Sequence, residues 1–255
     1  MSKVYFIGAG PGDPELITVK GQRIIAEAGL VLYAGSLVPR EVIAGAAKNA
    51  RVEDSASMSL QETHELMLEH ASRGETVARV HTGDPALYGA VQEQVRLLER
   101  DGIDFEIIPG VTSACAAAAA SRASFTVPGG TQTLILTRME GRTPVPESEG
   151  LEKLAAHNSA MAIYLSAGNP SGIQERLLAG GMDGATPVIL GHRIGWPDEK
   201  SVETVLENLA DTAVRNGFTR QTVFLILPGR NSESESLLYD AGFSHMFRDG
   251  SLENV

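Results

Sequence analysis

Three short stretches of the sequence combine glycine and proline with an aspartate or asparagine in the same order. They read GAGPGDP from Gly8, TGDP from Thr82 and AGNP from Ala167. In each, the Asp or Asn can cap a helix whose first residue is the following proline. Taken singly, each stretch indicates only a helix start. Together they indicate a small-ligand site, because the first N–H groups of a helix are available to bind a carboxylate or another acceptor.

The stretch at Gly8 does not fit a nucleotide-phosphate loop. A dinucleotide fold needs a third glycine where this chain has Asp13, whose charge would repel a pyrophosphate, and Pro11 removes a backbone donor. The second apolar run ends in VLYAG, without the acidic residue that binds a ribose, and no Walker G-K-[ST] follows the glycines. A nicotinamide-dependent oxidoreductase is therefore a disfavoured alternative from another class.

Apolar runs alternate with helical patterns along the whole chain. The runs VYFIG, LVLYAG, TVARVHTG and DFEIIPG predict strands in the first half, and TLILTR, AMAIYLSAG, TPVILGHR and TVFLILPG predict strands in the second. This alternation predicts an α/β fold with largely parallel strands, in which ligands bind beyond the carboxyl ends of the strands. In the first half, helices are predicted over residues 14–28, 60–73, 86–100 and 111–121.

The alternation is interrupted around FTVPGGTQ, which predicts one domain over residues 1–122 and a second over residues 123–255. With 21 Lys and Arg against 32 Asp and Glu, the chain disfavours nucleic acid and anionic membranes as partners. One cysteine excludes an internal disulfide framework, and the six histidines lack the spacing of metal ligands, so no metal is predicted. No apolar stretch is long enough for a membrane span and no signal core is evident, which favours a cytoplasmic protein.

Three stretches together carry a family resemblance. GAGPGDPELIT, RVHTGDPALYG and IIPGVTSA, in this order and at these separations, resemble the tetrapyrrole methylases, which use S-adenosylmethionine. Within that family, VLYAGSLVP, TLILTRMEGRTPVPE, GWPDEK and LYDAGFSHMFRDG are similar to the members that methylate C11 of precorrin-4, or of its cobalt form, in cobalamin biosynthesis. Methylation of another precorrin or uroporphyrinogen carbon, or of a substrate outside the tetrapyrroles, is the nearer alternative.

The resemblance implies the class III fold of S-adenosylmethionine-dependent methyltransferases. In that fold, two unlike α/β domains hold the cofactor, which leaves as S-adenosylhomocysteine, in a cleft between them. It also implies a homodimer and an anionic tetrapyrrole as substrate. The cofactor contacts that it implies are Pro11, Thr82, Gly83, Asp84, Leu87, Thr112 and Ser113 in the first domain and Leu165, Ile194 and Thr222 in the second.

Methyl transfer from a sulfonium needs alignment and exclusion of water more than a protein nucleophile. A base can help remove a proton from the reacting ring, and the candidates are Asp84, Tyr88 and His81. Asp84 is equally well explained as a helix cap. Because a precorrin carries many carboxylates, cationic side chains are expected to bind it. The substrate-binding candidates are Arg79, Arg138 and Arg142, with Lys20, Arg40 and Arg193 as further candidates.

Four other features favour structural roles. Cys115, among small residues, is predicted to fill a core, and His64 and His70, on a helix rich in glutamate, are predicted to lie on a solvated face. Trp196 precedes Pro197 in a loop, where it could cover the substrate or brace a subunit contact. The aromatic segment near the end of the chain is predicted to dock on a partner subunit.

Overall fold

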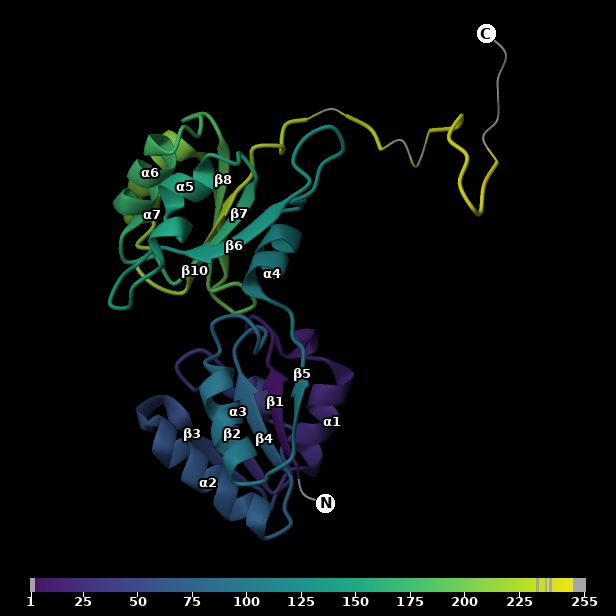
Figure 1. Ribbon diagram of the computed structural model, residues 1–255, viewed down its shortest axis with the longest axis vertical. Helices are drawn as coiled ribbons and strands as arrows, with labels where there is room; N and C mark the ends of the chain where they lie inside the picture. The colour runs from purple at the N-terminus through teal and green to yellow at the C-terminus, as the bar shows by residue number, and fades with distance from the viewer. Residues whose placement is uncertain (1–2, 233, 237, 239, 250–255) are drawn as a thin grey trace. The chain divides into compact units, whose positions relative to one another are not determined.

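The structure is a computed structural model that describes residues 3–232, 234–236, 238 and 240–249. Its contacts divide the chain into two units, one of Met1–Ala116 with Arg193–Lys200 and one of Ala117–His192 with Ser201–Val255. Each unit contains one sheet of five strands. Figure 1 labels the helices and most of the strands. The first change of unit comes a few residues before the predicted boundary. Arg193–Lys200, which the prediction places in the second domain, belongs to the first unit.

The sheet of the first unit is wholly parallel. Its order is β3-β2-β4-β1-β5, and each pair of neighbours runs in the same direction. All the loops that leave its strands therefore lie at one edge. The central neighbours β1 and β4 are the strands that GAGPGDP and TGDP follow. The strands are β1 (Val4–Gly8), β2 (Leu30–Tyr33), β3 (Arg51–Asp54), β4 (Val77–His81) and β5 (Phe105–Ile108).

Helices cover both faces of this sheet because the strand side chains alternate between two apolar clusters. Ile7 and Val80 pack with Ile24 and Ile25 of α1 on one face. On the other face, the cluster that contains Phe6 and Val77 also contains Met67 of α2 and Leu98 of α3, and all of these side chains are buried. The helices are α1 (Val19–Glu27), α2 (Leu60–Ser72), α3 (Val91–Arg100) and, after β5, α4 (Ser113–Ala120).

The sheet of the second unit is mixed, in the order β6-β7-β10-β8-β9. β6 and β7 are parallel, whereas β10 is antiparallel to both of its neighbours. The two sheets thus differ in order and direction, which confirms two unlike α/β domains, but the expectation of largely parallel strands is wrong for this sheet. The elements are β6 (Leu134–Arg138), α5 (Leu151–Ala155), β7 (Ala160–Tyr164), α6 (Pro170–Ala179), β8 (Pro187–His192), β9 (Lys200–Val205), α7 (Leu209–Arg215) and β10 (Thr222–Ile226).

Two of the three predicted helix caps are confirmed. Asp13 accepts a hydrogen bond from the Glu15 amide at the start of a short 3-10 helix, and Asn169 accepts one from the Gly172 amide at the start of α6. Asp84, in contrast, caps a turn. The helix predicted from residue 86 begins only at Val91, because Tyr88 and Ala90 have left-handed φ angles of 57° and 49°.

Two predictions of solvent exposure are wrong. His64 and His70 are buried, with 1% and 5% exposure, and each lies against a carboxylate. His64 Nε2 is 2.6 Å from Asp101 Oδ2, and His70 Nδ1 is 2.5 Å from Glu75 Oε2. Each pairing satisfies one ring nitrogen that would otherwise be costly to bury. Cys115, predicted as a core residue, is exposed on α4.

The Asp101 carboxylate should make the stability of the protein depend on acid pH. Hydrogen bonds from Arg100 and then from His64 lower its pKa below the usual range. Its contribution to the free energy of unfolding is therefore complete above the unfolded pKa of about 4 and is lost as the pH falls through the folded pKa. We expect Asp101→Asn to be less stable than the parent at neutral pH, and to lose less stability in urea titrations carried down to about pH 3. Parallel pH curves for the two proteins would contradict this.

Within the part of the chain that the structure describes, no helix is long and apolar enough to cross a membrane. The same residues contain no group of three or more His, Cys, Asp or Glu side chains placed to hold a metal ion. The predicted absence of a metal stays a prediction.

Candidate functional site

The two central glycine loops of the first unit are joined by main-chain hydrogen bonds. The Ala9 amide donates to the His81 carbonyl at 2.7 Å. Beyond it, Gly10 and Gly83 form an isolated antiparallel bridge. The Gly10 amide nitrogen lies 3.2 Å from the Gly83 carbonyl oxygen, and the Gly83 amide nitrogen lies 2.7 Å from the Gly10 carbonyl oxygen. The GAGPGDP and TGDP stretches, far apart in sequence, are therefore one continuous main-chain surface at the carboxyl edge of the sheet.

The loop after β5 joins this surface through Asp84. Asp84 Oδ1 accepts from the Ala86 amide at 2.8 Å, and Oδ2 accepts from the Gly110 amide at 2.9 Å. Gly110 is packed so closely that a Cβ there would lie 2.2 Å from the Gly83 carbonyl oxygen and 2.8 Å from the Gly8 Cα atom. Three loops thus converge on a point where only glycine fits, and both oxygens of Asp84 hold them together.

A distant segment, Arg193–Lys200, packs on the first of these loops. A Cβ at Gly12 would lie 2.5 Å from Cδ1 of Trp196, so the indole covers the glycine directly. The segment is held in shape by Arg193, whose Nε lies 2.6 Å from Asp198 and whose guanidinium stacks 4.2 Å from the centre of the Trp196 ring. Trp196 therefore braces the GAGPGDP loop from within the first unit.

Trp196 should report ligand binding at this loop. It is the one tryptophan of the chain, so fluorescence excited selectively in tryptophan comes from this indole alone. We expect S-adenosylhomocysteine to change that emission, saturably and with the dissociation constant found by calorimetry, because the loop under the indole is the predicted cofactor contact. Gly45→Ala, at a position where an added Cβ meets nothing, should show the same titration. Emission that stays constant while calorimetry records binding would contradict it.

His81 and Arg79 lie inside the first unit. His81 is 5% exposed, and burial, followed by the charge of Arg79, lowers its pKa to about 3. A neutral imidazole with so low a pKa is a poor proton acceptor at neutral pH. Arg79 is 7% exposed, and burial lowers its pKa to about 10, so it stays charged at neutral pH. These positions favour structural roles over the predicted proton transfer and substrate binding.

Tyr88 is the predicted catalytic side chain that solvent reaches most readily. Its exposed fraction is 45%, whereas Asp84 is half-buried with both oxygens engaged. It follows Leu87 in the loop after TGDP, at the first left-handed residue of the turn. Strained non-glycine residues of this kind are found disproportionately at functional sites.

The remaining cofactor positions of the first unit lie at the same edge of the sheet. Pro11 is buried, and the other five residues are half-buried and offer hydroxyl, main-chain and apolar groups. This donor set fits a small ligand that carries a carboxylate, hydroxyls and an apolar ring. The half-buried residues are Thr82, Gly83, Leu87, Thr112 and Ser113.

Two of the three predicted cofactor residues from the second half lie at one edge of the second sheet. Because Phe224 pairs with Ile163 in antiparallel register, Leu165 comes to the level of Thr222. Leu165 has a left-handed φ of 53° and is 69% exposed, whereas the Thr222 hydroxyl donates to the Arg220 carbonyl and lies 3.0 Å from His192 Nδ1. Ile194 is buried in the Arg193–Lys200 segment of the first unit.

Arg138 and Arg142 differ in what they contact. The Arg138 guanidinium donates to the carbonyls of Met139, Thr143 and Pro144, at 3.4, 3.3 and 2.6 Å, and so holds its own loop. Arg142, at the tip of that loop, is exposed, and the structure records no ion pair or hydrogen bond for it with any described residue. Of the two, Arg142 presents its charge to solvent.

Comparisons with known proteins show the family of the chain. The family described as Tetrapyrrole (Corrin/Porphyrin) Methylases matches residues 3–210 of the chain. The chain belongs to the tetrapyrrole methylase family. This tetrapyrrole methylase is 48% identical over 255 residues to the cobalt-precorrin-4 C(11)-methyltransferase of Priestia megaterium, covering 97% of this chain and 98% of that protein. It is 44% identical over 250 residues to the precorrin-4 C(11)-methyltransferase of Pseudomonas aeruginosa, covering 97% and 99%.

Solved structures of other tetrapyrrole methylases show the same fold. An X-ray structure of a cobalt precorrin-4 methyltransferase, a cobalamin biosynthetic enzyme, is similar with a TM-score of 0.86 and 48% identity, covering 88% of this chain and 94% of that one. The crystal structure of the uroporphyrin-III C-methyltransferase of Thermus thermophilus contains bound S-adenosylhomocysteine. Its TM-score is 0.73 at 30% identity, and the match covers 89% of this chain and 97% of that one. The predicted fold and family are confirmed.

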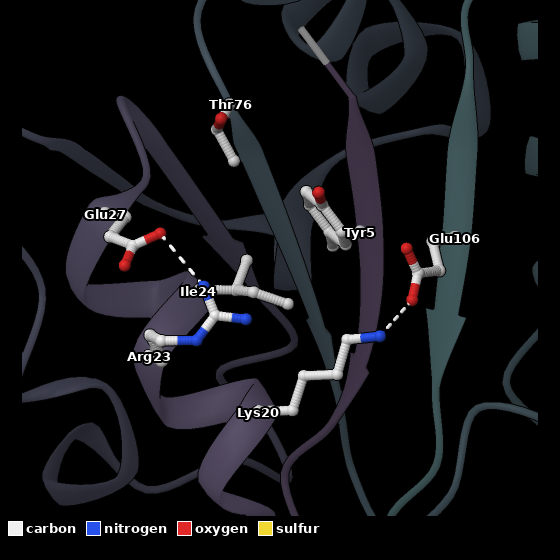
Figure 2. A pocket seen from close by; sticks show the side chains of 7 residues that line it. All are labelled: Tyr5, Lys20, Arg23, Ile24, Glu27, Thr76 and Glu106. Carbon is white, nitrogen blue, oxygen red and sulfur yellow. Dashed lines mark hydrogen bonds and ion pairs between the residues drawn. The ribbon is translucent and has the colours of Figure 1, made fainter.

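A separate pocket of the tetrapyrrole methylase lies between α1 and its sheet, and Figure 2 shows its side chains. Its volume is about 260 Å³, and it holds Lys20, one of the further substrate-binding candidates. Lys20 pairs with Glu106 across the pocket, and Arg23 lies 3.4 Å from Glu27. Because each cation already has a carboxylate partner, this pocket offers little to an anionic tetrapyrrole.

Sequence reasoning missed the contacts that brace the loops. Gly12 and Trp196 lie far apart in sequence, so no local pattern indicates that they are in contact. A tryptophan beside glycine and proline is the one local sign of a tightly packed turn. The buried polar side chains Ser55 and Gln94, which contact Arg79, were missed as well, because single polar residues give no periodic pattern.

Proposed function

We propose that the chain transfers a methyl group from S-adenosylmethionine to C11 of precorrin-4, or of its cobalt form, in cobalamin biosynthesis. The observation that carries this is the identity of 48% and 44%, over nearly the whole chain, to relatives named for that reaction. The Thermus thermophilus protein, named for uroporphyrin-III, is less similar at 30% identity. Methylation of a different ring carbon is therefore the second candidate.

S-adenosylmethionine supplies a methyl group that its sulfonium already activates. The chain has to bind and orient this donor and keep water away from it. We propose that main-chain groups of Gly83 and Asp84, with the hydroxyls of Thr82, Thr112 and Ser113, bind the cofactor. Pro11 and Leu87 would exclude water from its apolar parts, and Leu165, Ile194 and Thr222 are proposed as further contacts.

Tyr88 is the proposed group for proton transfer. A neutral phenol can donate and accept hydrogen bonds but does not itself take up a proton, so Tyr88 would orient the water that takes the proton leaving the ring carbon. The exposure of Tyr88 supports this choice over His81 and Asp84. Tyr88→Phe should lower kcat and leave cofactor binding unchanged if this assignment is right.

The proposed reaction is tested by the position of the new methyl group. Purified protein is incubated with precorrin-4, and in parallel with its cobalt form, and with S-adenosylmethionine labelled with carbon-13 in the methyl group. Carbon NMR of the product then locates the label. Label at C11 supports the proposal. Label at another carbon supports the second candidate, and no turnover of any tetrapyrrole with NADH binding in calorimetry would favour the oxidoreductase.

Arg142 and Arg138 should separate substrate binding from loop structure. Arg142→Ala is expected to raise KM for the tetrapyrrole about tenfold by removing an ion pair with a substrate carboxylate, and to leave thermal stability unchanged. Arg138→Ala releases three carbonyls of its loop, so it should lower stability as well as substrate affinity. Calorimetry with S-adenosylhomocysteine should give parent-like affinity in both. Unchanged KM in Arg142→Ala would remove this residue from the substrate site.

We also propose that the protein works as a cytoplasmic homodimer. The family resemblance supports this. The final aromatic segment is the proposed contact with the partner subunit, since Met246 and Phe247 are 89% and 88% exposed. Tyr239 and Gly250 of this segment lie outside the described residues. Sedimentation analysis of the full chain and of a Met246→Ser, Phe247→Ser variant tests the dimer and its contact together.

A further inference from the structure

A buried cation lies on the central strand β4 without a counterion among the described residues. The Arg79 guanidinium donates to Gln94 Oε1 at 3.0 Å, to Ser55 Oγ at 2.8 Å and to the Leu32 carbonyl at 3.3 Å. Each of these acceptors is neutral. An apolar side chain would fill the same space without the cost of desolvating a charge. Packing alone therefore does not account for Arg79, whereas its effect on the orientation of its hydrogen-bond partners can.

Gln94 connects Arg79 to the turn that precedes α3. Its side chain is almost fully buried, with 4% exposure. Oε1 accepts from Arg79 Nε, and Nε2 donates to the Ala90 carbonyl at 3.0 Å. Because a guanidinium can only donate, Arg79 fixes the amide with its oxygen toward β4 and its NH2 group toward Ala90. The direction of the Gln94 amide is thus set by the buried charge.

The Ala90 carbonyl belongs to a strained turn. Tyr88 and Ala90 both have left-handed φ angles, 57° and 49°, which residues with a Cβ atom adopt rarely. Such a conformation persists only where the surroundings hold it. At the start of α3, Ala90 provides no side-chain cap, and the Gln94 amide bonds its carbonyl. Gln94 is therefore placed to hold the turn that carries Tyr88.

We propose that Arg79 and Gln94 are positioning residues for methyl transfer. Arg79 orients the Gln94 amide, the amide holds the Ala90 carbonyl, and the turn keeps Tyr88 in its working position. This inference rests on the proposed function. It replaces substrate binding by Arg79 with an internal role, because the guanidinium donates to groups inside the first unit.

Gln94→Glu separates positioning from simple packing. Glutamate gives Arg79 a counterion, so a purely structural role predicts equal or higher Tm and parent-like turnover. The same change removes the donor to Ala90 and sets a carboxylate oxygen beside that carbonyl. Positioning predicts that kcat falls by about tenfold or more, while Tm does not fall and the Kd for S-adenosylhomocysteine stays within about threefold. Gln22→Glu, at an exposed position of α1, adds the same charge outside this network and should match the parent protein.

Rescue provides a second measurement. Glycine adopts left-handed φ without strain, so adding Ala90→Gly to Gln94→Glu should restore at least about a third of the parent kcat. A fluorine NMR spectrum of protein labelled with 3-fluorotyrosine reports Tyr88 directly, once its signal is assigned with Tyr88→Phe. The Tyr88 signal should shift or broaden in Gln94→Glu and return in the double variant.

Two results would overturn the inference. One is parent-like turnover of Gln94→Glu together with an unmoved Tyr88 signal. The other is a loss of kcat that Ala90→Gly does not restore, again with the signal unmoved. If the parent protein itself fails to methylate precorrin-4, the proposed function fails, and the fluorine spectra still show whether Gln94 holds the turn.

Discussion

Replacing Gly110 by alanine should weaken cofactor binding more than about tenfold and strongly destabilise the first unit. The new Cβ would lie 2.2 Å from the Gly83 carbonyl oxygen and 2.8 Å from the Gly8 Cα atom. Both neighbours are main-chain atoms of the two central loops, so no side chain can rotate to make room. Overpacking of this kind costs about 3 kcal/mol. The loops must separate, and the main-chain surface that they form together would be lost.

Chemical denaturation and calorimetry with S-adenosylhomocysteine measure these two effects. We expect the free energy of unfolding to fall by about 3 kcal/mol and the Kd to rise by more than about tenfold. Gly45→Ala is the matched control, because a Cβ at that position meets no atom within 4 Å. If Gly110→Ala bound the product with parent affinity, the convergence of the three loops would have no part in cofactor binding.

Asp84→Ala should be nearly as severe, for a different reason. Both carboxylate oxygens accept main-chain N–H groups, from Ala86 at 2.8 Å and from Gly110 at 2.9 Å. Hydrogen bonds to a charged acceptor contribute about 1.5–3 kcal/mol each, and the half-buried Gly110 amide would be left without this partner, whereas the exposed Ala86 amide can turn to water. We expect about 2–4 kcal/mol of destabilisation and weaker cofactor binding together.

Asp84→Asn distinguishes this clamp from a role in proton transfer. Asparagine keeps one acceptor and turns an NH2 group toward the second amide, so a clamp predicts that stability and cofactor affinity fall together. A proton acceptor predicts a different pattern, in which kcat falls while the Kd for S-adenosylhomocysteine and the free energy of unfolding hold. Asp13→Asn is the control, since among the described residues the Asp13 side chain bonds the Glu15 amide of its own turn and no other group.

The strands that the sequence predicted are those with apolar runs. β1, β2 and β4 are found because these interior parallel strands require apolar side chains on both faces, and β5, an edge strand, is found because its sequence FEII is still mostly apolar. β3 and β9 were missed. Both are edge strands with mostly exposed or half-buried residues, RVED and KSVETV, so charge and alternation replace the apolar run. Strand direction in the second sheet was also beyond reach, because a sequence pattern does not show which strands pair.

The parts of the candidate site that are formed by short local turns could be predicted from the sequence. The glycine, proline and aspartate stretches predicted the edge of the first sheet at which the three loops converge, and the resemblance gave the family. The roles of single side chains were harder. Histidine and arginine are common in active sites, yet His81 and Arg79 are buried, which favours structural roles for them. Asp84 reads as a helix cap or as a base, and its bond to Gly110 depends on a loop that lies well beyond it in sequence.

The contact of Trp196 with Gly12 limits how early the first unit can fold during translation. The amino-terminal unit includes Arg193–Lys200, and these residues are synthesised only after β6, β7 and β8. A nascent chain that ends at Ala116 therefore lacks the indole that covers its first glycine loop. The other unit is equally incomplete at that stage, since β10 follows later. Neither unit can be completed before Arg193–Lys200 has been synthesised, and the long-range contacts this requires favour slow, concerted folding.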